Sequence, residues 1–240
     1  MKITIWFDFQ CPFCYMGETM LEKALGEVEL TEPVTIEYKA YELNPKAPAI
    51  PVETMTDHFM DGHKFTLQEA EEHMEKVTRM AARVGLDYHL AEAKVCNSLD
   101  AHRLMKFAAG RLTPGKLKKL SFSIFKAEFE EEELISDRQL LASLAEAVGL
   151  NGEEVMEMFS TDAFIAEVRK DEEEIEARSD FEFIPFMLLP DGSVKQGVVS
   201  VGGLRKWLQA AIDGNSADPD NAPDSDPTPI AGCSPSGCGV

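Results

Sequence analysis

The motif Cys11-Pro12-Phe13-Cys14 lies near the start of the chain, between two segments of different periodicity. The residues before it, Ile3 to Phe9, are mostly β-branched and aromatic, which predicts a buried strand. The residues after it place apolar side chains at helical spacing, at Met16, Met20, Leu21, Leu25 and Val28. The chain is therefore predicted to open with a strand, a CxxC motif at a helix start, and a helix.

Segments further along the chain predict a second strand, a hairpin and a closing helix. Val34 to Tyr38 has the composition of a strand, and the loop at Asn44 to Pro51 holds three prolines. Phe186 to Leu189 and Val194 to Val198 flank the turn Pro190-Asp191-Gly192-Ser193, which predicts a hairpin. A closing amphipathic helix is predicted from Leu204, Trp207, Leu208, Ala211 and Ile212.

The region between the second strand and the hairpin is predicted to be helical. Three capping boxes predict helix starts, namely Thr66 with Glu69, Ser136 with Gln139, and Asn151 with Glu154. Thr113-Pro114 places a proline at the first position of another helix. Ser98 to Ala109 and Phe164 to Arg178 also have helical patterns.

This order of elements predicts an α/β fold, in which a thioredoxin-like domain carries an inserted all-helical domain. Removing the helical block leaves βαβ followed by ββα, which is the thioredoxin arrangement. The expected division is 1–53 and 179–213 for the two parts of the thioredoxin-like domain, 54–178 for the insertion, and 214–240 for a flexible acidic tail.

The tail contains a second cysteine pair, Cys233 and Cys238, separated by four small or turn-forming residues. A flexible linker of roughly 19 residues has an r.m.s. reach of about 24 Å, which brings this pair within reach of Cys11 at high effective concentration. One hypothesis is a second dithiol that exchanges electrons with the first. The alternatives are incidental cysteines and a zinc site that uses all four thiolates.

The formal net charge of −20 constrains the partners of this chain of 240 residues. Such a surface repels phosphate backbones and anionic lipid headgroups, so neither nucleic acid nor a membrane is expected as a partner. Met1 and Lys2 lead straight into the first strand, and no apolar run approaches the roughly 20 residues of a membrane span, which predicts a cytoplasmic protein. In a cytoplasmic protein, paired cysteines indicate redox catalysis or a metal site, and here we expect no metal.

The position of Cys11 at a helix start predicts a reactive sulfur. Unpaired N–H groups and the positive end of the helix dipole stabilise a thiolate there, so Cys11 is expected to ionise more readily than a free cysteine. Cys14 is expected to be more buried and to stay protonated until it resolves a mixed disulfide. Pro12 suits the first helical turn, where no N–H is needed. The plainer alternatives are a zinc half-site and two inert thiols.

The dipeptide Ile184-Pro185 stands directly before the predicted hairpin. In a thioredoxin-like fold, the proline at this place forms a cis bond and lies against the CxxC motif. The backbone of its neighbour then pairs with an extended substrate. We therefore expect a cis bond at Pro185, the plainer alternative being a proline that starts an edge strand.

The segment from Asp8 to Gly17 resembles the opening of the DsbA-like FrnE family, and Asn97 to Leu104 resembles a helix of the same family. The similarity covers residues 1–213 and includes Phe122 to Phe129, Ile135 to Asp137 and Leu144 to Leu150. The fold that this resemblance implies is a thioredoxin domain with an inserted helical domain.

The resemblance implies dithiol–disulfide exchange, with Cys11 as the nucleophile, Cys14 as the resolving cysteine and Pro185 as the cis proline. The pair Pro12-Phe13 stands where DsbA carries Pro-His, which implies a protein less oxidising than DsbA, whose potential is about −120 mV. Many relatives carry Gly-Val-Pro before the hairpin, so the bulkier Phe183-Ile184 leaves the substrate preference open.

Five residues are candidates for contact with substrate because the expected fold places them near the cysteines. They are Pro12, Phe13, Ile184, Asn97 and His102. Asn97 and His102 are expected to line a cleft over Cys11, the alternative for His102 being a packing role.

Other polar residues near the motif have less specific roles. Asp8 is expected to be partly buried, either as a proton acceptor for Cys14 or as a cap of the turn. Cys96 is expected to be a small buried residue, and Glu128 to Glu133 is expected to form a solvated face.

The sequence therefore predicts a protein disulfide oxidoreductase or isomerase that exchanges the Cys11/Cys14 dithiol with protein or small-molecule thiols and disulfides. No cofactor is expected apart from glutathione as a co-substrate, and the chain is expected to be a monomer or a homodimer. Two alternatives stay open: a glutathione-linked isomerase or transferase of the kappa-class type, and a chaperone-like peptide-binding protein. The kappa-class relatives carry a serine where Cys11 stands, which favours the redox prediction.

Overall fold

A mixed four-stranded sheet forms the centre of the computed structural model, which describes residues 1–30, 32–62, 64–91, 93–214, 231–234 and 237–239. The strand order is β2-β1-β3-β4. The strands are β1 (Lys2–Phe7), β2 (Thr35–Ala40), β3 (Phe186–Leu188) and β4 (Val194–Gln196). β1 pairs in parallel with β2 and antiparallel with β3, and β3 and β4 form an antiparallel hairpin. Together with the helices around the sheet, this confirms the predicted α/β thioredoxin-like fold.

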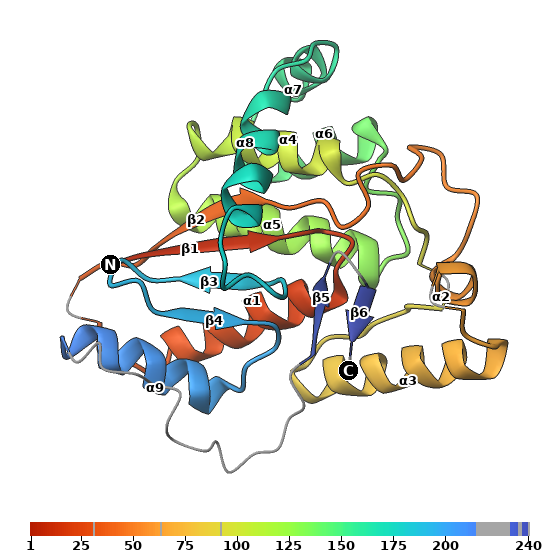
Figure 1. The fold of residues 1–240 in the computed structure, drawn as a ribbon. Coiled ribbons are helices and arrows are strands. Elements are labelled where there is room, and N and C mark those ends of the chain that lie inside the picture. Colours follow the sequence, from red (N-terminus) through yellow and green to blue (C-terminus); the bar gives the residue numbers. More distant parts are fainter. Residues whose placement is uncertain (31, 63, 92, 215–230, 235–236, 240) are drawn as a thin grey trace.

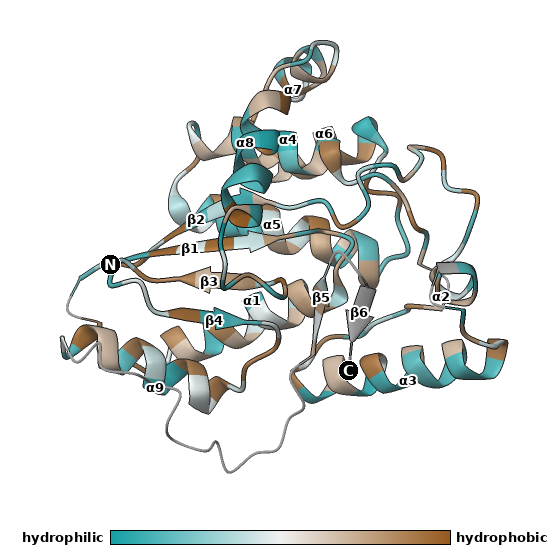
Figure 2. Ribbon diagram, viewed as in Figure 1, coloured by the Kyte–Doolittle hydropathy of each residue, from teal (hydrophilic) through white to brown (hydrophobic). Residues whose placement is uncertain are grey.

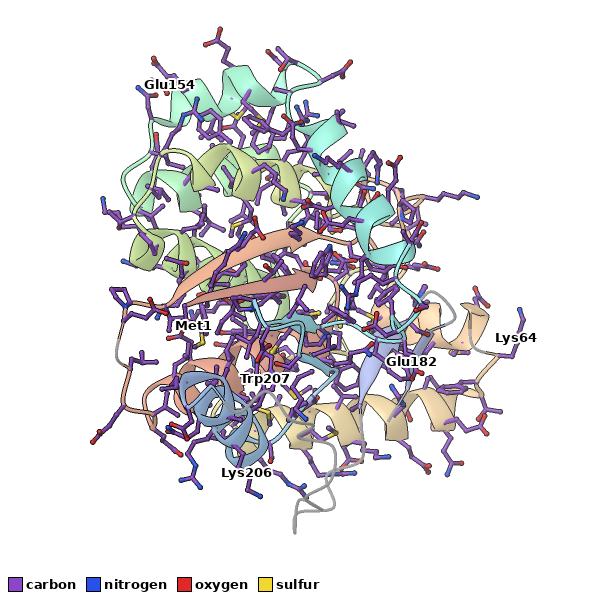
Figure 3. The ribbon with its side chains drawn as sticks, turned by 60° about the vertical axis from the view of Figure 1, so that its left-hand side comes forward. Met1, Lys64, Glu154, Glu182, Lys206 and Trp207 are labelled. Carbon is purple, nitrogen blue, oxygen red and sulfur yellow. The ribbon has the colours of Figure 1, made fainter. Side chains whose placement is uncertain are left out.

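Helices α1 (Pro12–Leu25) and α9 (Val201–Ile212) lie against each other beside the β3–β4 side of the sheet (Figure 1). The indole of Trp207 on α9 is buried, and its Nε1 donates a hydrogen bond to Ser193 Oγ at 2.9 Å (Figure 3). This bond joins the closing helix to the turn of the β3–β4 hairpin. The apolar positions that predicted both helices therefore face a shared core.

Seven helices stand between β2 and β3 in the described part of the chain. They are α2 (Met55–Gly62), α3 (Leu67–Arg83), α4 (Leu99–Ala109), α5 (Pro114–Phe129), α6 (Arg138–Ala147), α7 (Gly152–Phe159) and α8 (Ile165–Glu176). Helices α4, α6 and α7 gather beyond β2, α5 and α8 contact β2 itself, and α3 lies at the opposite side of the molecule (Figure 1). Figure 2 shows hydrophobic residues along β3 and hydrophilic residues over much of α3 and α8. The division of the chain into two domains stays a prediction.

Of the three predicted capping boxes, one forms completely and a second forms in part. Thr66 and Glu69 form the complete reciprocal box, and Asn151 accepts hydrogen bonds from the N–H groups of Glu153 and Glu154. The prediction for Ser136 is wrong because α6 begins one residue later: Asp137 is the N-cap and accepts from the N–H of Gln139. The Ser136 hydroxyl instead donates to the carbonyl of Ala49.

The predicted tail falls partly outside the described residues, which omit 215–230. The described end forms an antiparallel hairpin of β5 (Gly232–Ser234) and β6 (Gly237–Gly239), with Cys233 opposite Cys238. This corrects the expectation of a flexible segment reaching to residue 240, because β5 pairs with the body of the protein at Ile184. None of the helices described is long and apolar enough to cross a membrane.

Candidate functional site

Cys11 is the N-cap of α1, with an extended backbone, and Pro12 is the first helical residue. The N–H of Cys11 donates to the carbonyl of Asp8 at 3.1 Å, and the N–H of Cys14 donates to the carbonyl of Cys11 at 3.0 Å. No side chain caps this helix and no acidic residue occupies its first turn. The positive end of the helix dipole is therefore left to act on Cys11.

Both sulfurs are enclosed, which corrects the prediction that Cys14 is the more buried of the two. Cys11 is 0% exposed and Cys14 is 1% exposed. Burial, followed by the hydrogen bond with Cys11 and the charge of Cys11, raises the pKa of Cys14 well above its ordinary value. Cys14 is thus held as a protonated thiol next to a sulfur at an uncapped helix start, which suits a resolving cysteine.

The Ile184–Pro185 bond is cis, as the topology predicts. The ring of Pro185 packs directly against Gly17, one turn beyond Cys14 on α1. A methyl group added at Gly17 would lie 2.6 Å from Pro185 Cγ. The missing side chain at Gly17 therefore permits the proline loop to approach the helix that carries both cysteines.

The other expected substrate contacts are closed off from solvent in this structure. Pro12 is buried, and its carbonyl accepts a hydrogen bond of 2.6 Å from the hydroxyl of Tyr88. Phe13 and Ile184 are each 0% exposed. A substrate that touches any of these three residues therefore requires part of the structure to move.

His102 does not line an open cleft, which corrects the prediction for this residue. Its ring is buried, with its centroid 5.3 Å from the ring of Phe7 and 5.2 Å from that of Phe9. His102 Nε2 lies 3.4 Å from Asp8 Oδ1. Asn97 is partly buried, and its amide donates to Glu42 Oε1 at 3.3 Å.

Asp8 is almost wholly buried, although the sequence predicts partial burial. Its carboxylate accepts hydrogen bonds from the N–H of Leu43 at 2.7 Å and from the N–H of Gln10 at 3.2 Å. The bond from Gln10 caps the turn between β1 and α1, and the bond from Leu43 ties this turn to the segment after β2. The role of Asp8 as a proton acceptor for Cys14 stays a prediction.

Two buried acids near the motif escape the sequence analysis. Glu128 on α5 is buried, so the expected solvated face does not begin there, and burial raises its pKa well above the usual range. Its place on the inner side of an amphipathic helix, between Phe125 and Phe129, was the sequence signal that could have predicted this burial.

Cys96 is buried as predicted, and burial raises its pKa to about 12, which makes it an inert thiol.

Glu18 is the second buried acid and lies on α1, one turn after Cys14. Its carboxylate accepts hydrogen bonds from the Tyr38 hydroxyl at 2.5 Å and from the Ser121 hydroxyl at 2.8 Å. Both bonds favour the ionised form, but burial outweighs them and raises the pKa of Glu18 from 4.5 to about 7.

The pH dependence of stability should reveal Glu18. In the unfolded chain this group ionises near pH 4.5, whereas the folded protein keeps its proton up to about pH 7. Its contribution to stability is therefore largest below pH 4.5, falls as the pH rises to about 7, and is constant above that. Urea unfolding of wild type and Glu18→Gln should show the wild type losing about 3 kcal/mol relative to the variant over this interval. Parallel curves for the two proteins would contradict the assignment.

Cys233 is disulfide-bonded, whereas Cys11, Cys14 and Cys96 are free. Cys233 is 0% exposed and pairs through its backbone with Ile184, the residue before the cis proline. The structure thus brings the predicted auxiliary cysteine to the predicted site. Among the residues that the structure describes, no three His, Cys, Asp or Glu side chains come together as a metal site.

Comparison with known proteins bears on the family and the fold of the chain. A family model of the DSBA-like thioredoxin domain matches residues 2–209. The crystal structure of a probable DsbA oxidoreductase from Streptomyces coelicolor matches with a TM-score of 0.81 and 26% identity, over 100% of this chain and 99% of that one. The cytosolic disulfide reductase DsbM from Pseudomonas aeruginosa, in a structure with GSH, has a TM-score of 0.57 and 18% identity, over 89% of this chain and 100% of its own. The uncharacterised protein YwbO of Bacillus subtilis is 26% identical over 153 residues, which are 63% of this chain and 68% of YwbO.

Proposed function

This chain belongs to the DsbA-like thioredoxin family, and we propose that it is a thiol–disulfide oxidoreductase that uses Cys11 and Cys14 on protein or small-molecule disulfides. The observation that carries the proposal is the position of Cys11, a free cysteine at the uncapped start of α1. Cys14 follows within one turn, and the cis Pro185 lies against the same helix at Gly17. This combination provides a nucleophile, a resolving thiol and a backbone edge for substrate.

The reaction proceeds by two exchanges at sulfur. The Cys11 thiolate attacks one sulfur of a substrate disulfide, so a bond from Cys11 to the substrate forms as the substrate S–S bond breaks and one thiolate leaves. Cys14 then gives up its proton and attacks the sulfur of Cys11, which releases the second substrate thiolate. The substrate gains two electrons and two protons, and the Cys11/Cys14 dithiol becomes a disulfide.

The raised pKa of Cys14 sets the order of these steps. A buried, protonated Cys14 does not compete with Cys11 for the incoming disulfide. The thiol loses its proton only when a leaving thiolate is available to receive it. The reverse reaction would oxidise a substrate dithiol, and the potential of the cell decides the direction.

The tail pair is the proposed internal partner of this site. Cys233 is disulfide-bonded and pairs with Ile184 through two backbone hydrogen bonds, of 2.8 and 3.2 Å. Attack of Cys11 on a Cys233–Cys238 disulfide, followed by resolution by Cys14, would move two electrons from the active-site dithiol to the tail. The tail dithiol would then pass the two electrons to a substrate disulfide and re-form its own disulfide. External thiols, with glutathione as one candidate, would reduce the Cys11–Cys14 disulfide and so close the cycle.

The finer identity of the protein is part of the same proposal. We place the chain in the FrnE branch on the residues Asp8 to Gly17 and Asn97 to Leu104, and we propose a cytoplasmic reductase or isomerase. Paired cysteines in a reducing compartment are usually catalytic rather than structural. A cysteine at position 11 favours redox exchange over the kappa-class type of glutathione chemistry, in which a serine stands there.

Trapping of mixed disulfides tests the proposal. Cys14→Ala removes the resolving thiol, so adducts through Cys11 should accumulate with substrate proteins and with the tail cysteines of the same chain. Non-reducing electrophoresis and mass spectrometry of cysteine-linked peptides would identify both kinds of adduct. Cys11→Ser/Cys14→Ala is the control and should form none. A Cys14→Ala protein that forms no adduct in cell extract or with its own tail would refute the exchange mechanism.

A further inference from the structure

The hairpin strand β5 occupies the backbone edge beside Pro185. The N–H of Ile184 donates to the carbonyl of Cys233 at 2.8 Å, and the N–H of Cys233 donates back to the carbonyl of Ile184 at 3.2 Å. The N–H of Val198 also donates to the carbonyl of Ala231 at 2.7 Å, so the segment from Ala231 to Cys233 lies in a slot between Ile184 and Val198. Figure 1 shows the β5–β6 hairpin standing beside the start of α1. β5 is therefore bound as an added strand, in the manner in which extended peptides dock on exposed backbone edges.

The slot around β5 is shaped for a glycine before a cysteine. A methyl group at Gly232 would lie 2.9 Å from Phe183 Cβ, 3.2 Å from the carbonyl oxygen of Ile184 and 3.3 Å from Gly197 Cα. Two of these three neighbours are backbone atoms, and Phe183 Cβ sits next to the backbone, so the slot cannot widen by turning a side chain. The residue before Cys233 must therefore be glycine for β5 to lie as it does.

The walls of this slot are fixed independently of β5. The side chain of Gln196 accepts hydrogen bonds from the N–H groups of Glu182 at 2.8 Å and Phe183 at 3.1 Å, and its amide donates to Asp180 at 2.7 Å. Glu182 lies close to β5 in Figure 3. The segment leading to the cis proline is thus tied to β4 by hydrogen bonds in which β5 takes no part.

Docking of β5 coincides with a closed active site. Ala231 and Cys233 are 0% exposed, and so are Cys11 and Ile184. β5 also contacts α1, the helix that starts at the two cysteines. An attacking sulfur without solvent exposure cannot meet an external disulfide, so a displacement has to precede any reaction with a partner molecule.

We propose that β5 is an internal pseudosubstrate: it fills the strand position beside Pro185 that an extended, disulfide-bearing peptide must enter, and its Gly-Cys sequence mirrors the peptide that this position accepts. The preferred substrate is an extended chain with glycine directly before its half-cystine. β5 competes with that chain and lowers the activity of the enzyme toward external disulfides. This inference rests on the proposed function, because it takes Cys11 as the attacking sulfur.

The test compares two glycines in the full-length chain. Gly232→Ala and Gly232→Val add atoms that clash in the slot, whereas Gly115→Ala and Gly115→Val add the same atoms on α5, where nothing lies within 4 Å. The probes are a linear Ala-Gly-Cys peptide with a thionitrobenzoate group on its sulfur, the same peptide with leucine in place of glycine, and the bis-thionitrobenzoate disulfide alone. The reduced enzyme is mixed with each probe in excess, and the release of thionitrobenzoate in a single turnover is followed by absorbance at several probe concentrations. KM below is the half-saturating probe concentration of this single turnover. Alkylation of Cys11 by iodoacetamide is followed by mass spectrometry.

The Gly232 variants should alkylate about tenfold faster at Cys11 than wild type, and their KM for the glycine peptide should fall by a similar factor, because a weakened competitor leaves the site open more often. The Gly115 variants should match wild type. The leucine peptide should have a KM at least about fivefold above that of the glycine peptide in every protein, because its side chain overpacks the slot.

The results separate this inference from the proposed function. If the Gly232 variants release thionitrobenzoate from the small disulfide but keep the wild-type KM and the wild-type alkylation rate, β5 is no competitor and the inference is overturned. Equal KM values for the two peptides would overturn the glycine preference. Failure of every protein to react with any of the three probes would instead remove the proposed function, and the inference with it.

Discussion

Replacing Cys11 by serine should lower the rate of disulfide exchange by about three orders of magnitude or more, while the protein stays folded. The hydroxyl of serine at a helix start remains protonated at neutral pH, so no nucleophile replaces the thiolate. Cys14 cannot take over, because its burial, which is the largest cause of its raised pKa, remains in the variant and keeps the thiol protonated. Release of thionitrobenzoate from the small disulfide gives the rate, and far-ultraviolet circular dichroism gives the fold.

Cys96→Ser is the matched control for this experiment. Cys96 is also free and buried, but it lies before α4, and its sulfur accepts a long hydrogen bond of 3.6 Å from the side chain of Gln10. The same exchange of sulfur for oxygen should therefore leave the rate within about twofold of wild type. A Cys11→Ser protein with a tenth or more of the wild-type rate, or an equal loss in Cys96→Ser, would show that Cys11 is not the attacking sulfur.

Local sequence signals were sufficient for the sheet, the helices and the motif between them. β1 and α1 follow from periodicity over a few residues, and Thr66 with Glu69 marks a helix start without any tertiary contact. The cis bond at Pro185 could be predicted only from the topology, since the dipeptide Ile184-Pro185 has the same composition in either isomer.

The features that the sequence did not predict depend on contacts between distant segments. The sequence of β5 predicts part of an acidic, flexible tail. It forms a strand because Cys233 pairs with Ile184, which lies 49 positions earlier along the chain. His102 and Glu128 are polar residues whose burial depends on which helix faces cover the end of β1. A prediction from residue type alone assigns histidine and glutamate to the surface, because most of these residues are exposed in folded proteins. Tertiary packing determines which of them are buried.

Gly17→Val should impair exchange by about ten- to a hundredfold and lower the free energy of unfolding by about 1–3 kcal/mol. A β-carbon at this position would lie 2.6 Å from Cγ of Pro185 and 3.4 Å from the methyl group of Met187. Met187 can turn away, but the proline ring is part of the backbone loop between Ile184 and β3, so the loop itself has to retreat from α1. If the Pro185 loop retreats, the backbone edge that pairs with substrate moves away from the cysteines. A small displacement at a reacting centre has a large effect on the rate.

Gly115→Val separates the effect of position from the effect of valine in a helix, since both glycines are helical and nothing lies within 4 Å of a β-carbon added at Gly115. Urea unfolding gives the stability of each variant, and thionitrobenzoate release at a temperature where both are folded gives the rate per folded molecule. The approach of Pro185 to α1 is needed for function only if Gly17→Val loses rate while fully folded and Gly115→Val does not. A Gly17→Val protein that is less stable yet exchanges disulfides at the wild-type rate would show that the contact serves packing alone. In that case the cysteines at the start of α1 would act without the cis-proline loop held in place.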